Sequence, residues 1–142
     1  MLNIKQVESR QQLEDAYNIR KIVFVEEQNV PMEEEMDEHD ETSIHFVGYD
    51  PEGKPVAASR LRFVDEYGKL ERICVLKDVR GNHYGQQIIG EMEKRILIEG
   101  YQKAKLNGQT HAEDFYKNLG YETVSGEFMD AGIPHVTMIK KL

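Results

Sequence analysis

Apolar side chains recur along residues 84–97 at steps of three and four, the spacing of one face of an α-helix. These positions are Tyr84, Ile88, Ile89, Met92, Ile96 and Leu97. The preceding residues, 70–76, are rich in β-branched and apolar side chains suited to a buried strand. Gly100 follows the last turn of the helix, where a C-terminal cap belongs. The pattern therefore predicts a strand, a polar loop and then a long helix, and the rest of the chain is organised around this unit.

The remaining pattern predicts further strands and two more helices. Ser9 and Thr110 each precede a Gln or Glu by three residues, a capping-box pattern that opens a helix. Turn residues predict turns at 50–54 and at Tyr67–Gly68. Alternating or apolar runs predict strands at 2–7, 44–49, 56–64, 103–106, 121–124 and 136–139. The order β-α-(α)-β-β-β-α-β-α-β-β predicts one α/β domain over residues 1–142, with a mixed central sheet of about six to seven strands and flanking helices.

Composition and charge restrict the function. The chain has 142 residues, 39% of them hydrophobic and 31% charged, as expected of a globular protein. A net charge of −8 argues against nucleic-acid binding, which requires many Lys and Arg side chains, and favours cationic substrates. We expect no membrane span and no signal peptide, because no apolar run approaches the roughly 20 residues that a span needs. A single cysteine forms no internal disulfide, so we expect a cytoplasmic protein.

Residues 33–41 contain seven acidic side chains in nine. For any one of them, a solvated position on a helix or loop is the favoured interpretation. As a group, they could also attract a positively charged amine to the mouth of a site.

The junction between the predicted strand and the long helix has the features of an anion site. The first amides of a helix have no partner within the helix, and the helix dipole places partial positive charge there. Gly81 and Gly85 have no side chains to obstruct a ligand, and Arg80 adds a cation. An ordinary strand–helix connection with two convenient glycines is the alternative. Neither G-x-G-x-x-G nor a Walker loop is present.

Residues 80–85, RGNHYG, resemble motif A of the GNAT superfamily of N-acetyltransferases, [QR]-x-x-G-x-[GA], which follows a strand and opens a helix. Arg80 and Gly85 match the motif, whereas His83 replaces its middle glycine.

A second segment, 109–121, resembles the motif N-x-x-A-x-x-[LF]-Y-x-x-x-G-[FY] of the same superfamily. Gln109 stands where the family usually has Asn. The matching residues are Ala112, Phe115, Tyr116, Gly120 and Tyr121. Segments 23–31, 70–76 and 130–135 are similar to the bacterial subgroup that contains ElaA and YjcF, so the resemblance covers nearly the whole chain.

The resemblance implies a GNAT-like fold and direct acetyl transfer from acetyl-CoA to a primary amine of a small molecule or peptide. Tyr116 matches the tyrosine that commonly protonates the leaving thiolate, as a general acid. A homodimer is a further expectation, because dimers are common in the superfamily. The implied acetyl-CoA-binding residues are Ile73, Cys74 and Val75 along the pantetheine arm, Arg80, Gly81, Asn82, His83, Tyr84, Gly85 and Gln86 around the pyrophosphate, and Gln109.

The base that deprotonates the amine is less well defined. Glu71 is the first choice, since its strand would lie beside the thioester; an outward-facing carboxylate or an ion pair with Arg72 is the alternative. Water could replace it. Weaker candidates around the acceptor are Glu26, Glu27, His111 and His135.

Other chemistries find little support. The five histidines show no close metal-ligand spacing, and no G-x-S-x-G elbow is present, so we expect no metal and no serine hydrolase. Cys74 lies in an apolar strand and reads as an inert thiol. A non-catalytic sensor of CoA or acyl-CoA is the alternative function, because His83 stands in a glycine position.

Overall fold

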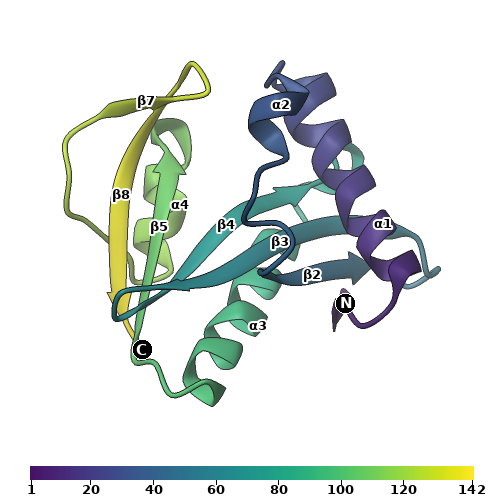
Figure 1. Cartoon of the computed structure of the whole chain (residues 1–142), viewed down its shortest axis with the longest axis horizontal. Helices are drawn as coiled ribbons and strands as arrows, with labels where there is room; N and C mark the ends of the chain where they lie inside the picture. The colour runs from purple at the N-terminus through teal and green to yellow at the C-terminus, as the bar shows by residue number, and fades with distance from the viewer.

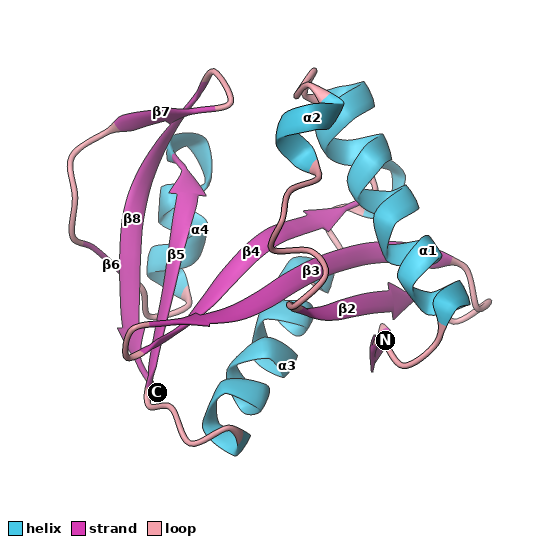
Figure 2. Ribbon diagram, in the orientation of Figure 1, coloured by secondary structure: helices cyan, strands magenta, loops and turns pink.

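A mixed sheet of eight strands forms the centre of the protein in the computed structural model, which describes all 142 residues (Figures 1 and 2). The strands are β1 (Asn3–Gln6), β2 (Ile44–Tyr49), β3 (Pro55–Val64), β4 (Tyr67–Val75), β5 (Lys103–Gln109), β6 (Glu122–Thr123), β7 (Phe128–Asp130) and β8 (Ile133–Lys141). The α-helices are α1 (Arg10–Arg20), α2 (Met32–Glu35), α3 (Tyr84–Ile98) and α4 (Glu113–Asn118). A π-helix, η1 (Lys21–Glu27), continues α1, and two short 3₁₀ turns are η2 (Lys77–Val79) and η3 (Thr110–Ala112).

The strand order is β1-β2-β3-β4-β5-β8-β6, with β7 paired to β8. All neighbours are antiparallel except β4 and β5, which pair in parallel only where residues 68–70 meet residues 104–106. Beyond Leu70 the two strands separate, and Figure 1 shows the resulting opening between the upper ends of β4 and β5. The site described below lies in this opening.

The two faces of the sheet are covered differently. Helix α3 packs on one face, against β3, β4 and β5, and buries an apolar stripe of Ile88, Ile89, Met92 and Ile96. Helix α1 packs on the other face, against β2 and β3, through Ala16 and Ile19. The apolar spacing that predicted α3 thus corresponds to its buried face.

The main predictions of fold are confirmed. The mixed α/β class and the order of the long elements are as expected, and β7 is an additional short strand. Gly100 adopts the left-handed φ of 89° that a C-terminal cap requires. Ser9 caps α1, its Oγ accepting a hydrogen bond from the amide of Gln12 at 3.2 Å.

Two local predictions were wrong. Tyr67 and Gly68 lie within β4. The chain turns at residues 65–66 instead, where Asp65 takes a left-handed φ of 54°. Thr110 does not cap a helix: it begins the 3₁₀ turn η3, and α4 starts at Glu113 without a side-chain cap. The Glu113 carboxylate instead accepts a hydrogen bond from the hydroxyl of Thr123, which removes it from the capping box.

Candidate active site

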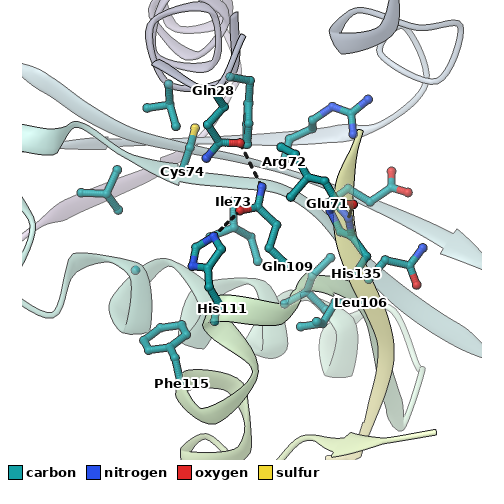
Figure 3. Close-up of a pocket in the computed structure, with 18 of the residues that line it drawn as sticks. Gln28, Glu71, Arg72, Ile73, Cys74, Leu106, Gln109, His111, Phe115 and His135 are labelled. Carbon is teal, nitrogen blue, oxygen red and sulfur yellow. Dashed lines mark hydrogen bonds between the residues drawn. The ribbon is translucent and has the colours of Figure 1, made fainter. Parts of the chain in front are cut away.

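A cavity of about 950 Å³ occupies the opening between β4 and β5. Its walls come from the end of β4, the start of α3, the end of β5, α4, the β7–β8 turn and η1 (Figure 3). Elements far apart in the sequence therefore meet at one hollow. The expected site residues that line it are Glu27, Glu71, Ile73, Cys74, Val75, Arg80, Gly81, His83, Tyr84, Gly85, Gln86, Gln109, His111, Tyr116 and His135.

Asn82 and Glu26 are the two expected site residues that do not line the cavity. The side-chain amide of Asn82 turns back on its own loop and donates a hydrogen bond to the Val79 carbonyl at 2.8 Å. We find no contact that would give Glu26 a place in this site.

The backbone explains the glycine pattern at the start of α3. His83 caps the helix with a left-handed φ of 63°, and Gly81 has a φ of 91°. Glycine adopts such angles without strain, so glycine at position 83 would suit this backbone better than histidine. Gly85, in the first turn, has room for a Cβ atom, which would lie 3.6 Å from Phe115 and 4.0 Å from Val75.

Arg80 is held at the rim rather than left as a free cation. Its Nε donates a hydrogen bond to the Val75 carbonyl at 3.0 Å, and its two terminal nitrogens bind the Glu27 carboxylate at 2.7 and 2.8 Å. The hydrogen bonds from Arg80 lower the pKa of Glu27, although partial burial opposes the shift. This pair joins η1 to the β4–α3 loop.

The strand β4 offers the cavity its backbone rather than reactive side chains. Cys74 is buried, its thiol lies 3.7 Å from the Ala58 carbonyl, and burial raises its pKa to about 12. Such a thiol stays protonated and is a poor nucleophile. The residues after Leu70 pair with β3 on one side and with no strand on the other, so this edge of β4 faces the cavity unpaired.

Tyr116 projects from α4 into the cavity wall. Its ring packs so closely on Gly108 that a Cβ there would lie 2.9 Å from the ring, and it meets Tyr121 edge to face at 6.2 Å between ring centroids. Its hydroxyl makes no hydrogen bond within the chain. Burial raises the pKa of Tyr116 to about 12, so the hydroxyl keeps its proton at neutral pH and is able to donate it.

Glu71 lines the cavity but is held by three cations. Its carboxylate lies 2.7 Å from Arg60, 2.9 Å from Arg62 and 2.9 Å from Lys69. Burial alone would raise the pKa of Glu71, but these partners lower it to about 2.

A carboxylate held in this way is a weak proton acceptor, which argues against the expected role of Glu71 as the base. Glu71 also forms no ion pair with Arg72, which was one of the alternative interpretations. Arg72 takes a left-handed φ of 55° and turns to Asp37, 3.2 Å away, instead.

The acidic segment is the largest difference from the sequence-based expectation. Glu35 and Asp40 are 2% and 5% exposed, and each lies 2.6 Å from the fully buried Arg20. Asp40 also lies 3.0 Å from Arg60, which is 1% exposed. These carboxylates neutralise buried guanidinium groups rather than attract a substrate.

A sequence signal for this network existed in the arginines. Arg20 lies on the apolar side of α1, and Arg60 lies in the apolar run of β3. Buried arginines need carboxylate partners. Of the two carboxylates of the acidic segment that line the cavity, only Glu34 has no ion pair.

A chain of three polar side chains crosses the cavity (Figure 3). The Gln109 side-chain amide donates a hydrogen bond to the side-chain oxygen of Gln28 at 2.9 Å, and the Gln109 oxygen lies 2.5 Å from Nε2 of His111. Gln28 had not been predicted, because only the π-turns of η1 bring it to this wall. No other side-chain hydrogen bond joins residues 1–43 to residues 103–142.

Two further features concern metal ligands and membrane spans. No three His, Cys, Asp or Glu side chains converge as metal ligands would. No helix is both long enough and apolar enough to cross a bilayer.

Comparisons with known proteins agree with the geometry. The acetyltransferase (GNAT) domain family matches residues 5–142. YjcF of Bacillus subtilis (strain 168), named an uncharacterized N-acetyltransferase, is 52% identical over 133 residues, which are 93% of this chain and 94% of YjcF.

Solved structures share the fold. Escherichia coli ElaA superposes with a TM-score of 0.86 at 24% identity, covering 99% of this chain and 100% of ElaA. An aminoglycoside 6'-N-acetyltransferase complexed with coenzyme A has a TM-score of 0.77 at 16% identity, covering 98% of this chain and 96% of that one.

Proposed function

The chain belongs to the GNAT family of acetyltransferases, and from this premise we propose that it transfers the acetyl group of acetyl-CoA directly to a primary amine of a small molecule or peptide. The observation that carries the proposal is the cavity between β4 and β5. It brings an unpaired strand edge, the start of a long helix and a protonated tyrosine to one space. A thioester ligand with an extended arm and a pyrophosphate matches these three features.

The pyrophosphate is assigned to the start of α3. Helix α3 runs for 15 residues, and its first amides and dipole favour an anion. Gly81 and Gly85 line the cavity there and leave the backbone accessible. Because Arg80 is already paired with Glu27, the phosphate contacts come mainly from backbone amides in this proposal.

The pantetheine arm is assigned to the free edge of β4. Ile73, Cys74 and Val75 line the cavity, and no strand pairs with them on the β5 side. An extended amide-bearing chain can bind such an edge as an added strand would. The same coenzyme is present in the aminoglycoside acetyltransferase structure that shares this fold, which supports the assignment.

Tyr116 serves as the general acid in this mechanism. When bound, acetyl-CoA supplies the thioester whose carbonyl carbon the amine attacks. As the carbon–sulfur bond breaks, the Tyr116 hydroxyl donates its proton to the leaving sulfur. At neutral pH the Tyr116 phenol carries its proton before that step.

The direct test measures release of CoA thiol from acetyl-CoA with a panel of polyamines, aminoglycosides, amino acids and peptides. At least one amine should give turnover and an acetylated product of the expected mass. CoA binding without turnover on any amine would instead favour a non-catalytic sensor, the function that His83 in a glycine position left open.

Tyr116→Phe tests the assignment of the acid. It removes only the hydroxyl, and loss of a positioned acid lowers the rate by roughly 10²-fold or somewhat less, because a thiol leaves readily. Tyr121→Phe is the matched control, since that hydroxyl hydrogen-bonds Glu93 at 2.8 Å outside the cavity. If chemistry is rate-limiting and Tyr116→Phe has the same turnover number as the parent, then Tyr116 only packs in the cavity wall and is not the general acid.

A further inference from the structure

Acetyl transfer to an amine requires a proton acceptor, because an ammonium has no lone pair with which to attack. Of the carboxylates that line the cavity, Glu27, Glu35 and Glu71 are held in ion pairs, whereas Glu34 and Asp130 are not. Glu71 is bound by three cations, and Glu27 is bound by both terminal nitrogens of Arg80. A useful acceptor needs an unoccupied lone pair that faces the cavity.

His135 meets this requirement. It lies on β8, paired in register with Gln109 of β5 on one side and with Phe128 of β7 on the other. Its Nδ1 lies 2.6 Å from the Ile133 carbonyl oxygen. A carbonyl oxygen can only accept a hydrogen bond, so the neutral ring carries its proton on Nδ1 and its lone pair on Nε2.

The ring is also fixed in orientation. It stacks on Phe128 with an interplanar angle of 24° and 6.1 Å between ring centroids, and the residue is only 9% exposed. Nε2 makes no hydrogen bond within the chain. Unlike Nδ1 of His45, which is buried without a partner, Nε2 of His135 remains open to solvent. Because His135 lines the cavity, the cavity is the space that Nε2 can reach.

We propose that Nε2 of His135 accepts the proton of the acceptor ammonium, an inference that rests on the proposed function. An N–H bond of the ammonium breaks and an Nε2–H bond forms, leaving a neutral amine and an imidazolium. The hydrogen bond from Nδ1 to the Ile133 carbonyl is kept in both states and stabilises the charged one.

The remaining protons balance. After attack, the nitrogen loses a second proton as the amide forms, and this proton replaces the one that Tyr116 gave to the thiolate. His135 releases its own proton to solvent after the product leaves. The net products are the amide, CoA thiol and one proton.

His111 is the other histidine in the cavity and serves as the matched control. Since the Gln109 amide donates to Gln28, its oxygen must accept from Nε2 of His111, which leaves Nδ1 of His111 unprotonated. The His111 ring is more exposed than that of His135 and is held by this single hydrogen bond. Its orientation is therefore less well defined than that of His135.

Other charged or titratable groups share the cavity wall with His135. The charged groups on β4 are paired, Glu71 with Lys69 and Arg72 with Asp37, and the β5 residues that line the cavity are all neutral. Among these groups are Lys69, Glu71 and Arg72 on β4, Asp130 on β7 and His111 on η3.

The test is the pH dependence of kcat/KM for the parent, His135→Gln and His111→Gln, with an amine identified by the panel. The parent should lose activity at low pH with a slope of one, as its base becomes protonated. His135→Gln should lower the rate by roughly 10²-fold or more and remove that inflection, whereas His111→Gln should keep it. CoA affinity, measured by calorimetry, should change little in His135→Gln.

An unchanged inflection in His135→Gln, or its loss in His111→Gln, would overturn the assignment. Lack of turnover by the parent on every amine would overturn the proposed function itself. A second measurement needs no variant: imidazole ¹⁵N shifts of the parent at neutral pH should show His135 protonated on Nδ1. A neutral ring protonated on Nε2 would contradict the proposal even if His135→Gln failed to fold.

Discussion

The face of the sheet under α3 is packed by apolar side chains, whereas the face under α1 and α2 buries a network of charges. Under α3, Ile88, Met92 and Ile96 are fully buried against the strands. Under α1, the fully buried Arg20 and Arg60 bind four carboxylates between them. Apolar packing stabilises the fold but is not directional. The ion pairs of the charged face are directional, and they fix the orientation of the acidic segment and of the Glu71 side chain at the cavity.

Removing one member of the charged network should have the largest effect on stability. Arg60 contacts Asp37 at 2.7 Å, Asp40 at 3.0 Å and Glu71 at 2.7 Å. Arg60→Ala leaves these carboxylates close together without their cation, and breaking a buried pair costs roughly 3–5 kcal/mol. Urea unfolding measures the loss.

Ile96→Val on the apolar face is the control for Arg60→Ala, with an expected loss of roughly 0.5–1.5 kcal/mol. If Arg60→Ala loses no more free energy of unfolding than Ile96→Val, the network has little structural importance.

Acid should weaken the charged face selectively. The pKa of Glu71 is lowered from 4.5 to about 2, so its ion pairs stabilise the fold fully above pH 4.5 and are lost as the pH falls toward 2. At about 1.4 kcal/mol per pKa unit, this contribution is roughly 3 kcal/mol. Unfolding free energies measured between pH 6 and pH 3 should fall less steeply for Glu71→Gln than for the parent. Parallel curves would contradict the assignment.

A smaller effect should follow from overfilling the apolar face. A Cβ at Gly68 would lie 2.3 Å from Cγ1 of Ile96, and the buried, β-branched Ile96 has little freedom to move away. Gly68→Ala should therefore destabilise by roughly 1–3 kcal/mol. Ile96→Ala removes Cγ1, Cγ2 and Cδ1, so in thermal unfolding the double variant Gly68→Ala/Ile96→Ala should lose less stability than the sum of the two single variants. A double variant that is less stable than the sum of the single changes would show that the clash lies elsewhere.

The smallest effect is expected at position 83. His83→Gly removes the backbone strain of a non-glycine residue at a φ of 63°, which stabilises the fold. Glycine also has more freedom in the unfolded chain, which opposes this gain, so the free energy of unfolding should change by no more than about 1 kcal/mol. His83→Ala keeps the Cβ atom and should be the less stable of the two in thermal unfolding. The reverse order would mean that the histidine ring contributes packing.

The sequence predicted the apolar face well because its signals are local. The three- and four-residue spacing along α3 corresponds to the buried stripe, and the apolar run before it is the interior strand β4. The sequence also predicted a site at the junction of these two elements from Gly81 and Gly85, and both residues line the cavity.

The ion pairs of the charged face could not be predicted, because the arginines at apolar positions signal buried charge but do not identify their partners, which are distant in the sequence. Glu35 and Asp40 look like solvated acids locally, and only the tertiary fold brings them to Arg20, 15 and 20 residues away. The ion pairs of Glu71 were not predicted either, because its partners Arg60 and Arg62 lie on the neighbouring strand β3. Gln28 reaches the cavity through a π-helix, a feature without a clear sequence signal.

Calorimetric titration of CoA into Gly85→Ala and Gly85→Leu tests the central claim most directly, namely that the coenzyme binds at the start of α3. A Cβ at Gly85 meets only Phe115 and Val75 at ordinary contact distances, so alanine should fold and bind CoA nearly as the parent does. The leucine side chain extends further into the cavity wall and should abolish binding while circular dichroism shows an intact fold. A folded Gly85→Leu protein that binds CoA with the parent's affinity would contradict the account.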